Sequence, residues 1–332
     1  MKILYFTSPD PDNLQDAYLH GLRMLYGSEL VDYPKKEVMY KGWNARPHTE
    51  MYGRLFTIWR TLDDIPVDRT DIDSRLRKNY YDIIIFGSIE RTLPFYRFYL
   101  PYLKFNKTIL LDGEDRRAFN PAFARKFLYF KRELQSKASY YYNYKLFPKP
   151  LYKRTTCHRN VLPISFAIPK EKITNGITEQ HKTRLFPSQI VDLELKEHPK
   201  VRQYAKNVDA TTHIFDNELD YYRDLQSAKF GITTKRGGWD CLRHYEIAAN
   251  GAVICFRDLL NKEPLNAPHG LNETNCLAYA SAAELLEKIE SLTSEKYASL
   301  LHEGYKWIHS QTTEVKAADM LKRAFDFWKK YA

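Results

Sequence analysis

Residues 221–256 read YYRDLQSAKFGITTKRGGWDCLRHYEIAANGAVICF, and this stretch decides the fold. Its apolar residues alternate between the spacing of helices and the short runs typical of buried strands. Asp240 is suited to cap the amino end of a short helix, and Gly251 is suited to end it. Alternating strands and helices predict a parallel sheet covered by helices. The predicted elements are a strand at 213–215, a helix at 218–227, a strand at 229–234, a helix that begins after Asp240, and a strand at 252–256.

Segment 235–246 combines a flexible backbone with positive charge. Gly237 and Gly238 let the backbone approach a ligand, and the amino end of the following helix offers unpaired N–H donors. Arg243 adds a cation, as do the two residues before the glycines, so the segment suits a diphosphate. Glu246 lies on the same helix face and can accept hydrogen bonds from ribose hydroxyls. The candidate contacts with a nucleotide sugar are Lys235, Arg236, Gly237, Gly238, Trp239, Asp240, Arg243, His244, Tyr245 and Glu246.

A plainer interpretation of this segment stays open. Arg243 and Glu246 are three residues apart, and such a pair on a helix surface can be a weak ion pair. The two glycines can likewise serve only a turn.

The amino-terminal half also predicts a parallel sheet. Apolar strands are expected at 2–7, 29–33, 81–87 and 108–111, with a helix after the first strand capped by Asp12 or Asn13. No GxGxxG follows the first strand, which argues against an ordinary dinucleotide-binding dehydrogenase. The last strand runs into Asp112, Glu114 and Asp115, and ligands in such sheets bind at the carboxyl ends of strands. These acids are candidates for a catalytic base, and the alternative is a solvated turn.

Composition and charge narrow the class of protein. The chain is 44% hydrophobic, which is enough for a packed core, and its length of 332 residues suggests two domains. The composition also excludes the disordered and fibrous classes of protein. The longest apolar runs are too short for a membrane span, so we expect a cytoplasmic location. A net charge of +10 attracts nucleotides, nucleic acid and anionic lipid alike. Aromatic and basic residues interleave between Leu93 and Phe105, which fits core packing, an acceptor surface or peripheral contact with the inner membrane face.

The stretch from Tyr221 to Phe256 resembles the donor-site segment of GT-B glycosyltransferases: a strand, a glycine loop, an arginine and a glutamate on a helix, then A-x-G and an apolar strand. The whole chain resembles most the group-1 and CgeB-like bacterial enzymes. This resemblance implies an α/β fold with two Rossmann-like domains that face each other across a cleft. The implied division is an acceptor-side domain at 1–155, a nucleotide-sugar donor domain at 156–310, and a C-terminal helix at 311–332 that packs back towards the first domain.

The resemblance also implies an activity. The enzyme would move a sugar from a UDP- or GDP-linked donor to a hydroxyl of a glycan or lipid-linked acceptor, as in polysaccharide biosynthesis, without a resident cofactor. Arg243 and the glycine loop would hold the diphosphate, and Glu246 the ribose. Helix dipoles and basic side chains would replace a metal, although Asp112-Gly113-Glu114 has a DxD-like shape.

Two points stay open. Many retaining members carry a second glutamate where this chain has Gly238, so a retaining or an inverting outcome is possible. An inverting enzyme needs a base, for which Asp10 and His20 are candidates beside the three acids. The alternatives in function are a phage-type enzyme that glycosylates DNA, with nucleic acid as acceptor, and a non-enzymatic basic nucleic-acid-binding protein.

Overall fold

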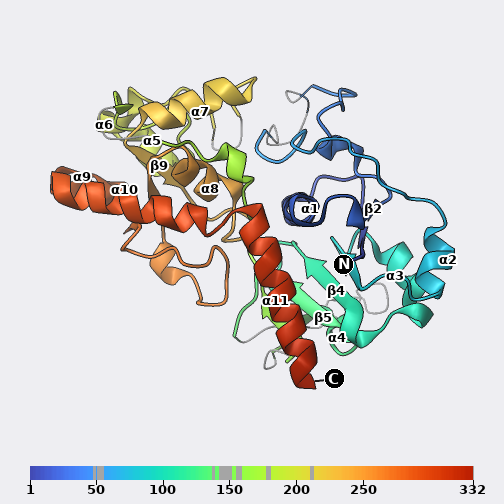
Figure 1. Ribbon diagram of the computed structural model, residues 1–332. Helices are drawn as coiled ribbons and strands as arrows, with labels where there is room; N and C mark the ends of the chain where they lie inside the picture. The colour runs from blue at the N-terminus through green and yellow to red at the C-terminus, as the bar shows by residue number, and fades with distance from the viewer. Residues whose placement is uncertain are drawn as a thin grey trace.

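The computed structural model describes residues 1–47, 50, 56–136, 139–141, 152–154, 159–176, 181–209 and 213–331. The amino-terminal half is built on six parallel strands in the spatial order β2-β1-β3-β4-β5-β8 (Figure 1). These strands are β1 (Ile3–Phe6), β2 (Leu30–Tyr33), β3 (Ile83–Phe86), β4 (Thr108–Asp112), β5 (Leu128–Lys131) and β8 (Val161–Pro163). A separate antiparallel pair consists of β6 (Ser139–Tyr141) and β7 (Tyr152–Arg154).

The central strands β1, β3 and β4 are buried on both faces, because helices cover the sheet. The helices are α1 (Asn13–Tyr26), α2 (Ile72–Arg77), α3 (Leu93–Tyr99) and α4 (Pro121–Ala124). Asp12 caps α1 by accepting hydrogen bonds from the backbone N–H groups of Leu14 and Gln15, as the sequence predicted.

The carboxyl-terminal half has a smaller parallel sheet in the order β11-β10-β9. Its strands are β9 (Phe230–Thr233), β10 (Val253–Arg257) and β11 (Cys276–Tyr279). Its helices are α5 (Leu193–Glu197), α6 (Pro199–Arg202), α7 (Glu218–Ser227), α8 (Leu242–Ala249), α9 (Ala282–Glu290) and α10 (Ser294–His309). The predicted helix at 218–227 and the strands on either side of α8 are confirmed.

The predicted strand at 213–215 is wrong, because these residues have no strand structure. Their apolar side chains pack instead against an aromatic ring of α7: the rings of His213 and Phe215 lie 5.0 Å and 5.5 Å from that of Tyr221. A short apolar run therefore marked a packing contact and not a strand.

The chain passes between the halves at two places that lie side by side. Residues 166–168 lead into the second half, and residues 311–313 lead back to α11 (Thr313–Tyr331). Ile168 donates its N–H to the carbonyl of Gln311 (3.1 Å), and Thr313 donates to the carbonyl of Ile168 (2.9 Å). Helix α11 then lies against α1 in the first half (Figure 1). A Cβ atom on Gly21 would collide with the carbonyl of Thr313, so the two helices meet closely.

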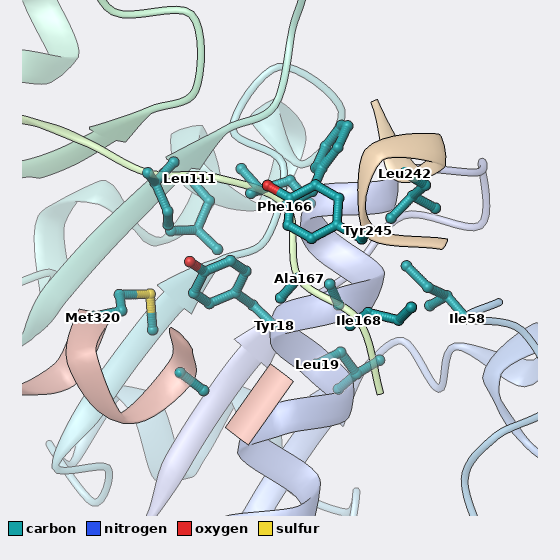
Figure 2. Packing of buried hydrophobic residues seen from close by; sticks show 14 of the residues in the cluster. Tyr18, Leu19, Ile58, Leu111, Phe166, Ala167, Ile168, Leu242, Tyr245 and Met320 are labelled. Carbon is teal, nitrogen blue, oxygen red and sulfur yellow. The ribbon is translucent and has the colours of Figure 1, made fainter. Parts of the chain in front are cut away.

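One hydrophobic cluster continues from the first half into the second. Figure 2 shows the crossing residues Phe166, Ala167 and Ile168 in the same cluster as Tyr18 of α1 and Tyr245 of α8. All five are buried. Because this core spans the junction, the two sheets are packed together and not merely linked. Among the residues that the structure describes, no helix is long and apolar enough to cross a membrane.

Candidate functional site

A cleft of about 250 Å³ lies between the two halves, at the carboxyl ends of β4 and β9. The first half and the crossing contribute Asn13, Phe56, Thr57, Asp115 and Phe166 to its walls, and the second half contributes Gln189, His213, Tyr221, Arg236, Gly237, Gly238, Asp240, Cys241, Leu242, Arg243 and Glu246. The carboxyl ends of parallel strands are where ligands bind in open α/β sheets.

The amino end of α8 faces this cleft, since Cys241, Leu242 and Arg243 all line it. The N-cap residue is Cys241, and no side chain caps the helix. The predicted N-cap at Asp240 is therefore wrong by one residue. The Asp240 carboxylate does not cap the helix, because it accepts hydrogen bonds from Phe166 and Tyr245. At the other end, Gly251 has a positive φ of 67° and donates its N–H to Ala248, which confirms the predicted stop. An uncapped helix end that faces a cleft offers N–H donors to an anion.

Arg243 and Glu246 lie next to each other on the cleft wall. Nη1 of Arg243 is buried and has no hydrogen-bond partner among the described residues. The half-buried Glu246 accepts hydrogen bonds from the Tyr221 hydroxyl (2.7 Å) and from the Thr57 hydroxyl. Burial raises the pKa of Glu246, while the hydrogen bonds from Thr57 and Tyr221 and the charge of Arg243 oppose that rise. A buried, unsatisfied guanidinium nitrogen is costly, and an anion in the cleft would satisfy it.

The glycine loop is pressed against the first half of the protein. A Cβ atom on Gly237 would collide with the carboxylate of Asp115, and one on Gly238 would collide with that of Glu133. Gly238 accepts a hydrogen bond at its carbonyl from the N–H of Arg236 (3.0 Å). The close approach that requires glycine is therefore an approach to the opposite half, which the sequence alone could not reveal.

A buried arginine that the sequence analysis missed holds this junction together. Arg132 follows β5 and donates to the carbonyls of Gly113 (3.0 Å) and Asp240 (2.9 Å), and to the carboxylates of Glu133 (2.9 Å) and Asp115. Its guanidinium also lies over the Phe166 ring, 4.5 Å from the centroid. A signal was present in the sequence, since 132–133 is a charged pair directly after a buried strand.

Asp240 links the glycine loop to the crossing between the halves. Its carboxylate accepts from the N–H of Phe166 (2.7 Å) and the hydroxyl of Tyr245 (2.9 Å), and its own N–H donates to Glu133 (3.2 Å). Burial raises its pKa to about 6, although Arg132 and the Phe166 N–H act in the opposite direction. Asp240 lines the cleft, but both of its carboxylate oxygens are bonded within the protein.

Four of the predicted contacts do not line the cleft, namely Lys235, Trp239, His244 and Tyr245. Trp239, His244 and Tyr245 are buried in the core. His244 bonds Thr233 (2.9 Å) and the carbonyl of Trp239 (2.9 Å), and burial lowers its pKa to about 3, so the ring is neutral. Trp239 carries the ammonium group of Lys235 over its ring at 5.1 Å. The side chains of Trp239, His244 and Tyr245 therefore support the glycine loop from the core, and Lys235 is exposed on that loop.

The structure separates the three candidate acids of the first half. Asp112 is buried and accepts hydrogen bonds from Lys131 (2.7 Å) and the Tyr129 hydroxyl, so it is paired in the core. Glu114 lies 3.8 Å from the guanidinium of Arg91. Only Asp115, of these three, lines the cleft. The strand end thus brings one carboxylate to the cleft, because Asp112 is still part of β4 and is bonded to Tyr129 and Lys131 of the neighbouring strand β5.

The two other base candidates lie elsewhere. His20 is buried on α1 and bonds Thr313 (2.8 Å) and Glu171 (3.2 Å), and Asp10 is not among the lining residues. Within the described part of the chain, no group of three or more His, Cys, Asp or Glu side chains could hold a metal ion.

No protein-family model and no curated protein matches this sequence. Solved structures, in contrast, match over almost the whole chain. A glycosyltransferase from Rickettsia africae is 10% identical, with 100% of this chain and 99% of that chain covered and a TM-score of 0.52. HepE from Anabaena in complex with UDP is 9% identical, with 98% and 100% covered and a TM-score of 0.57. HepE in complex with UDP-glucose is 9% identical, with 97% and 100% covered and a TM-score of 0.53.

At this level of identity the likeness defines the fold alone. The chain has the GT-B fold, with two α/β halves and a cleft between them, as the sequence predicted. The CgeB-like assignment within that fold stays a prediction. The predicted domain boundary between 155 and 156 lies outside the described residues.

Proposed function

We propose that this protein transfers a sugar from a nucleotide diphosphate donor to a hydroxyl group of an acceptor. One observation carries the proposal: an unsatisfied, buried guanidinium nitrogen of Arg243 lies beside the Glu246 carboxylate, at the uncapped end of α8, in the cleft of a GT-B fold. An anion and a vicinal diol would together satisfy these groups, and a nucleotide sugar carries both.

Arg243 and the amino end of α8 bind the diphosphate in this proposal, and Arg236 and Lys235 add positive charge at its rim. Glu246 accepts hydrogen bonds from the ribose hydroxyls. When the bond between the sugar carbon and the diphosphate oxygen breaks, negative charge grows on the diphosphate. Fixed cations and helix N–H groups stabilise that charge, which is the role that a divalent metal ion has in other enzymes.

Asp115 is the residue that we assign to the acceptor side. The acceptor oxygen forms the new bond to the sugar carbon, and its proton must pass to a base. Asp115 lines the cleft opposite α8, with its side chain 60% exposed and one oxygen paired with Arg132. Asp112 is not assigned this role, because its carboxylate is buried and paired with Lys131.

The donor that we favour is UDP- or GDP-linked. HepE binds UDP and UDP-glucose in crystals, and this supports a UDP-linked donor in a chain of the same fold. The aromatic rings of Phe56, His213 and Tyr221 on the cleft wall give a nucleobase a surface for stacking. The acceptor that we propose is a glycan or a lipid-linked sugar, reached in the cytoplasm, with peripheral contact with the membrane for the lipid-linked case.

Binding experiments test the proposal directly. We expect UDP or GDP to bind the wild-type protein in calorimetry, and Arg243→Met and Glu246→Gln to weaken that binding by about tenfold or more. Arg223→Met and Glu290→Gln are matched controls, because both side chains are exposed and lie outside the cleft. If neither nucleotide binds, or if the cleft variants bind as tightly as the controls, the proposed function is wrong.

A further inference from the structure

Thr57 of the first half donates a hydrogen bond to Glu246, the carboxylate of the second half that we propose to bind the ribose. Thr57 is buried, with 1% of its surface exposed, and its hydroxyl donates a hydrogen bond to Oε1 of Glu246. A hydroxyl has a single proton, so the Tyr222 hydroxyl, 3.1 Å away, must donate to Thr57 in turn. The resulting chain of donors runs from Tyr222 of the second half through Thr57 of the first half and back to Glu246 of the second.

The segment that carries Thr57 is fixed by the second half. Lys172 donates to the carbonyl of Phe56 (3.4 Å) and forms an ion pair with Glu218 of α7 (2.6 Å). The Phe56 ring lies 5.5 Å from the His213 ring and 6.4 Å from the Tyr221 ring. Backbone, charge and ring contacts therefore all hold the segment against α7, where Thr57 meets Glu246.

The geometry leaves Glu246 able to bind a ligand. Thr57 and Tyr221 each donate to a different carboxylate oxygen, so the two bonds fix the rotation of the group. An ionised carboxylate can accept about four hydrogen bonds, and two are used here. Glu246 still lines the cleft, so its remaining capacity is available to hydroxyl groups there.

We infer that Thr57 is a positioning residue that orients Glu246 towards the ribose of the donor, so that this part of the donor site is complete only when both halves are together. The inference rests on the proposed function. It makes the first half a contributor to donor recognition as well as to acceptor binding. The protein should then prefer ligands whose ribose has free hydroxyl groups, and this preference should depend on the side-chain hydroxyl of Thr57.

The test compares two ligands and two variants by calorimetry. The ligands are the nucleoside diphosphate that binds, UDP or GDP, and its 2′,3′-dideoxy analogue. In the wild-type protein the ribose form binds more tightly. Thr57→Val keeps the shape of the side chain and removes the hydroxyl, and we expect the preference for the ribose form to fall roughly five- to tenfold. Thr57→Ser keeps the hydroxyl, and we expect it to retain the preference to within about twofold.

Each other result has a distinct meaning. If Thr57→Val keeps the wild-type preference, or weakens both ligands equally, the positioning role is wrong, because a purely structural residue would not discriminate between them. Unchanged binding of the dideoxy form by Thr57→Val establishes that this variant is folded. If the wild-type protein binds neither UDP nor GDP, the proposed function fails first, and this inference fails with it.

Discussion

Replacing Arg132 with methionine should destabilise the protein strongly. Arg132 is almost fully buried and joins β5, the loop after β4 and the glycine loop of the second half. Methionine fills a similar volume but donates no hydrogen bond. The substitution leaves the carbonyls of Gly113 and Asp240 without this donor, and it leaves the buried Glu133 without its cation.

The magnitude follows from which partners are buried. Removing one partner of a buried ion pair costs about 3–5 kcal/mol, because the other charge is left uncompensated. The side chain of Glu133 is 2% exposed, so it belongs to this case. That of Asp115 is 60% exposed, and its pair with Arg132 adds about 0–1 kcal/mol. Since losses at one residue do not add, we expect a total of about 3–5 kcal/mol.

Urea denaturation measures this change, with circular dichroism and tryptophan fluorescence as two probes of unfolding. The comparison includes Asp115→Asn, which removes the exposed partner and should change the free energy of unfolding by no more than about 1 kcal/mol. A loss of less than about 1 kcal/mol in Arg132→Met would refute the reasoning, because the cation would then not be needed at the junction.

Two further predictions concern packing and pH. Gly21→Ala should destabilise the protein by about 1–3 kcal/mol, because the added Cβ meets the backbone of Thr313. Gly304→Ala in α10 is the control and should not destabilise it, because the nearest atom to the added Cβ is 3.6 Å away. Equal urea denaturation curves for the two variants would contradict the close fit of α1 and α11. His244 has a pKa of about 3 in the folded protein and roughly 6.5 when unfolded. Its neutral ring therefore contributes stability that is present above pH ~6.5 and lost as the pH falls towards 3. The wild-type protein should therefore lose about 2 kcal/mol of its free energy of unfolding through this group between pH 8 and pH 5. In His244→Gln, the difference in free energy of unfolding between these two pH values, measured in urea, should be smaller by about 2 kcal/mol. An unchanged difference would rule this role out.

The sequence predicts those features that depend on neighbouring residues. Apolar runs gave β1, β3 and β4, helical spacing gave α1 and α7, and the pattern around Gly251 gave the end of α8. Arg243 and Glu246 could be placed on one helix face because their spacing is local. The error at 213–215 has the same origin, since an apolar run does not reveal whether a partner strand exists.

The rest of the site depends on contacts between residues distant in the chain. Thr57 meets Glu246 across 189 positions, and Arg132 meets Asp240 across 108. The charged pair at 132–133 marks the end of a strand, but the local pattern of neither residue pair indicates its distant partner. For the same reason the sequence could not tell which of the acids after β4 would reach the cleft, because the partners of Asp112 lie on β5.

The side-by-side crossings of the chain determine how this fold can be recombined. Helix α11 follows the second half in the chain but packs against α1 in the first, so a chimera with a single exchange point in the middle of the chain would combine α1 of one parent with α11 of the other. Their fit at Gly21 leaves no room for a mismatch. An exchange of residues 169–310 alone would keep both helices from one parent and join the two chains at adjacent points. The second half is therefore joined to the first like an insert, and we expect the proposed donor site to be transferred by transplanting that insert together with the residue that faces it at position 57.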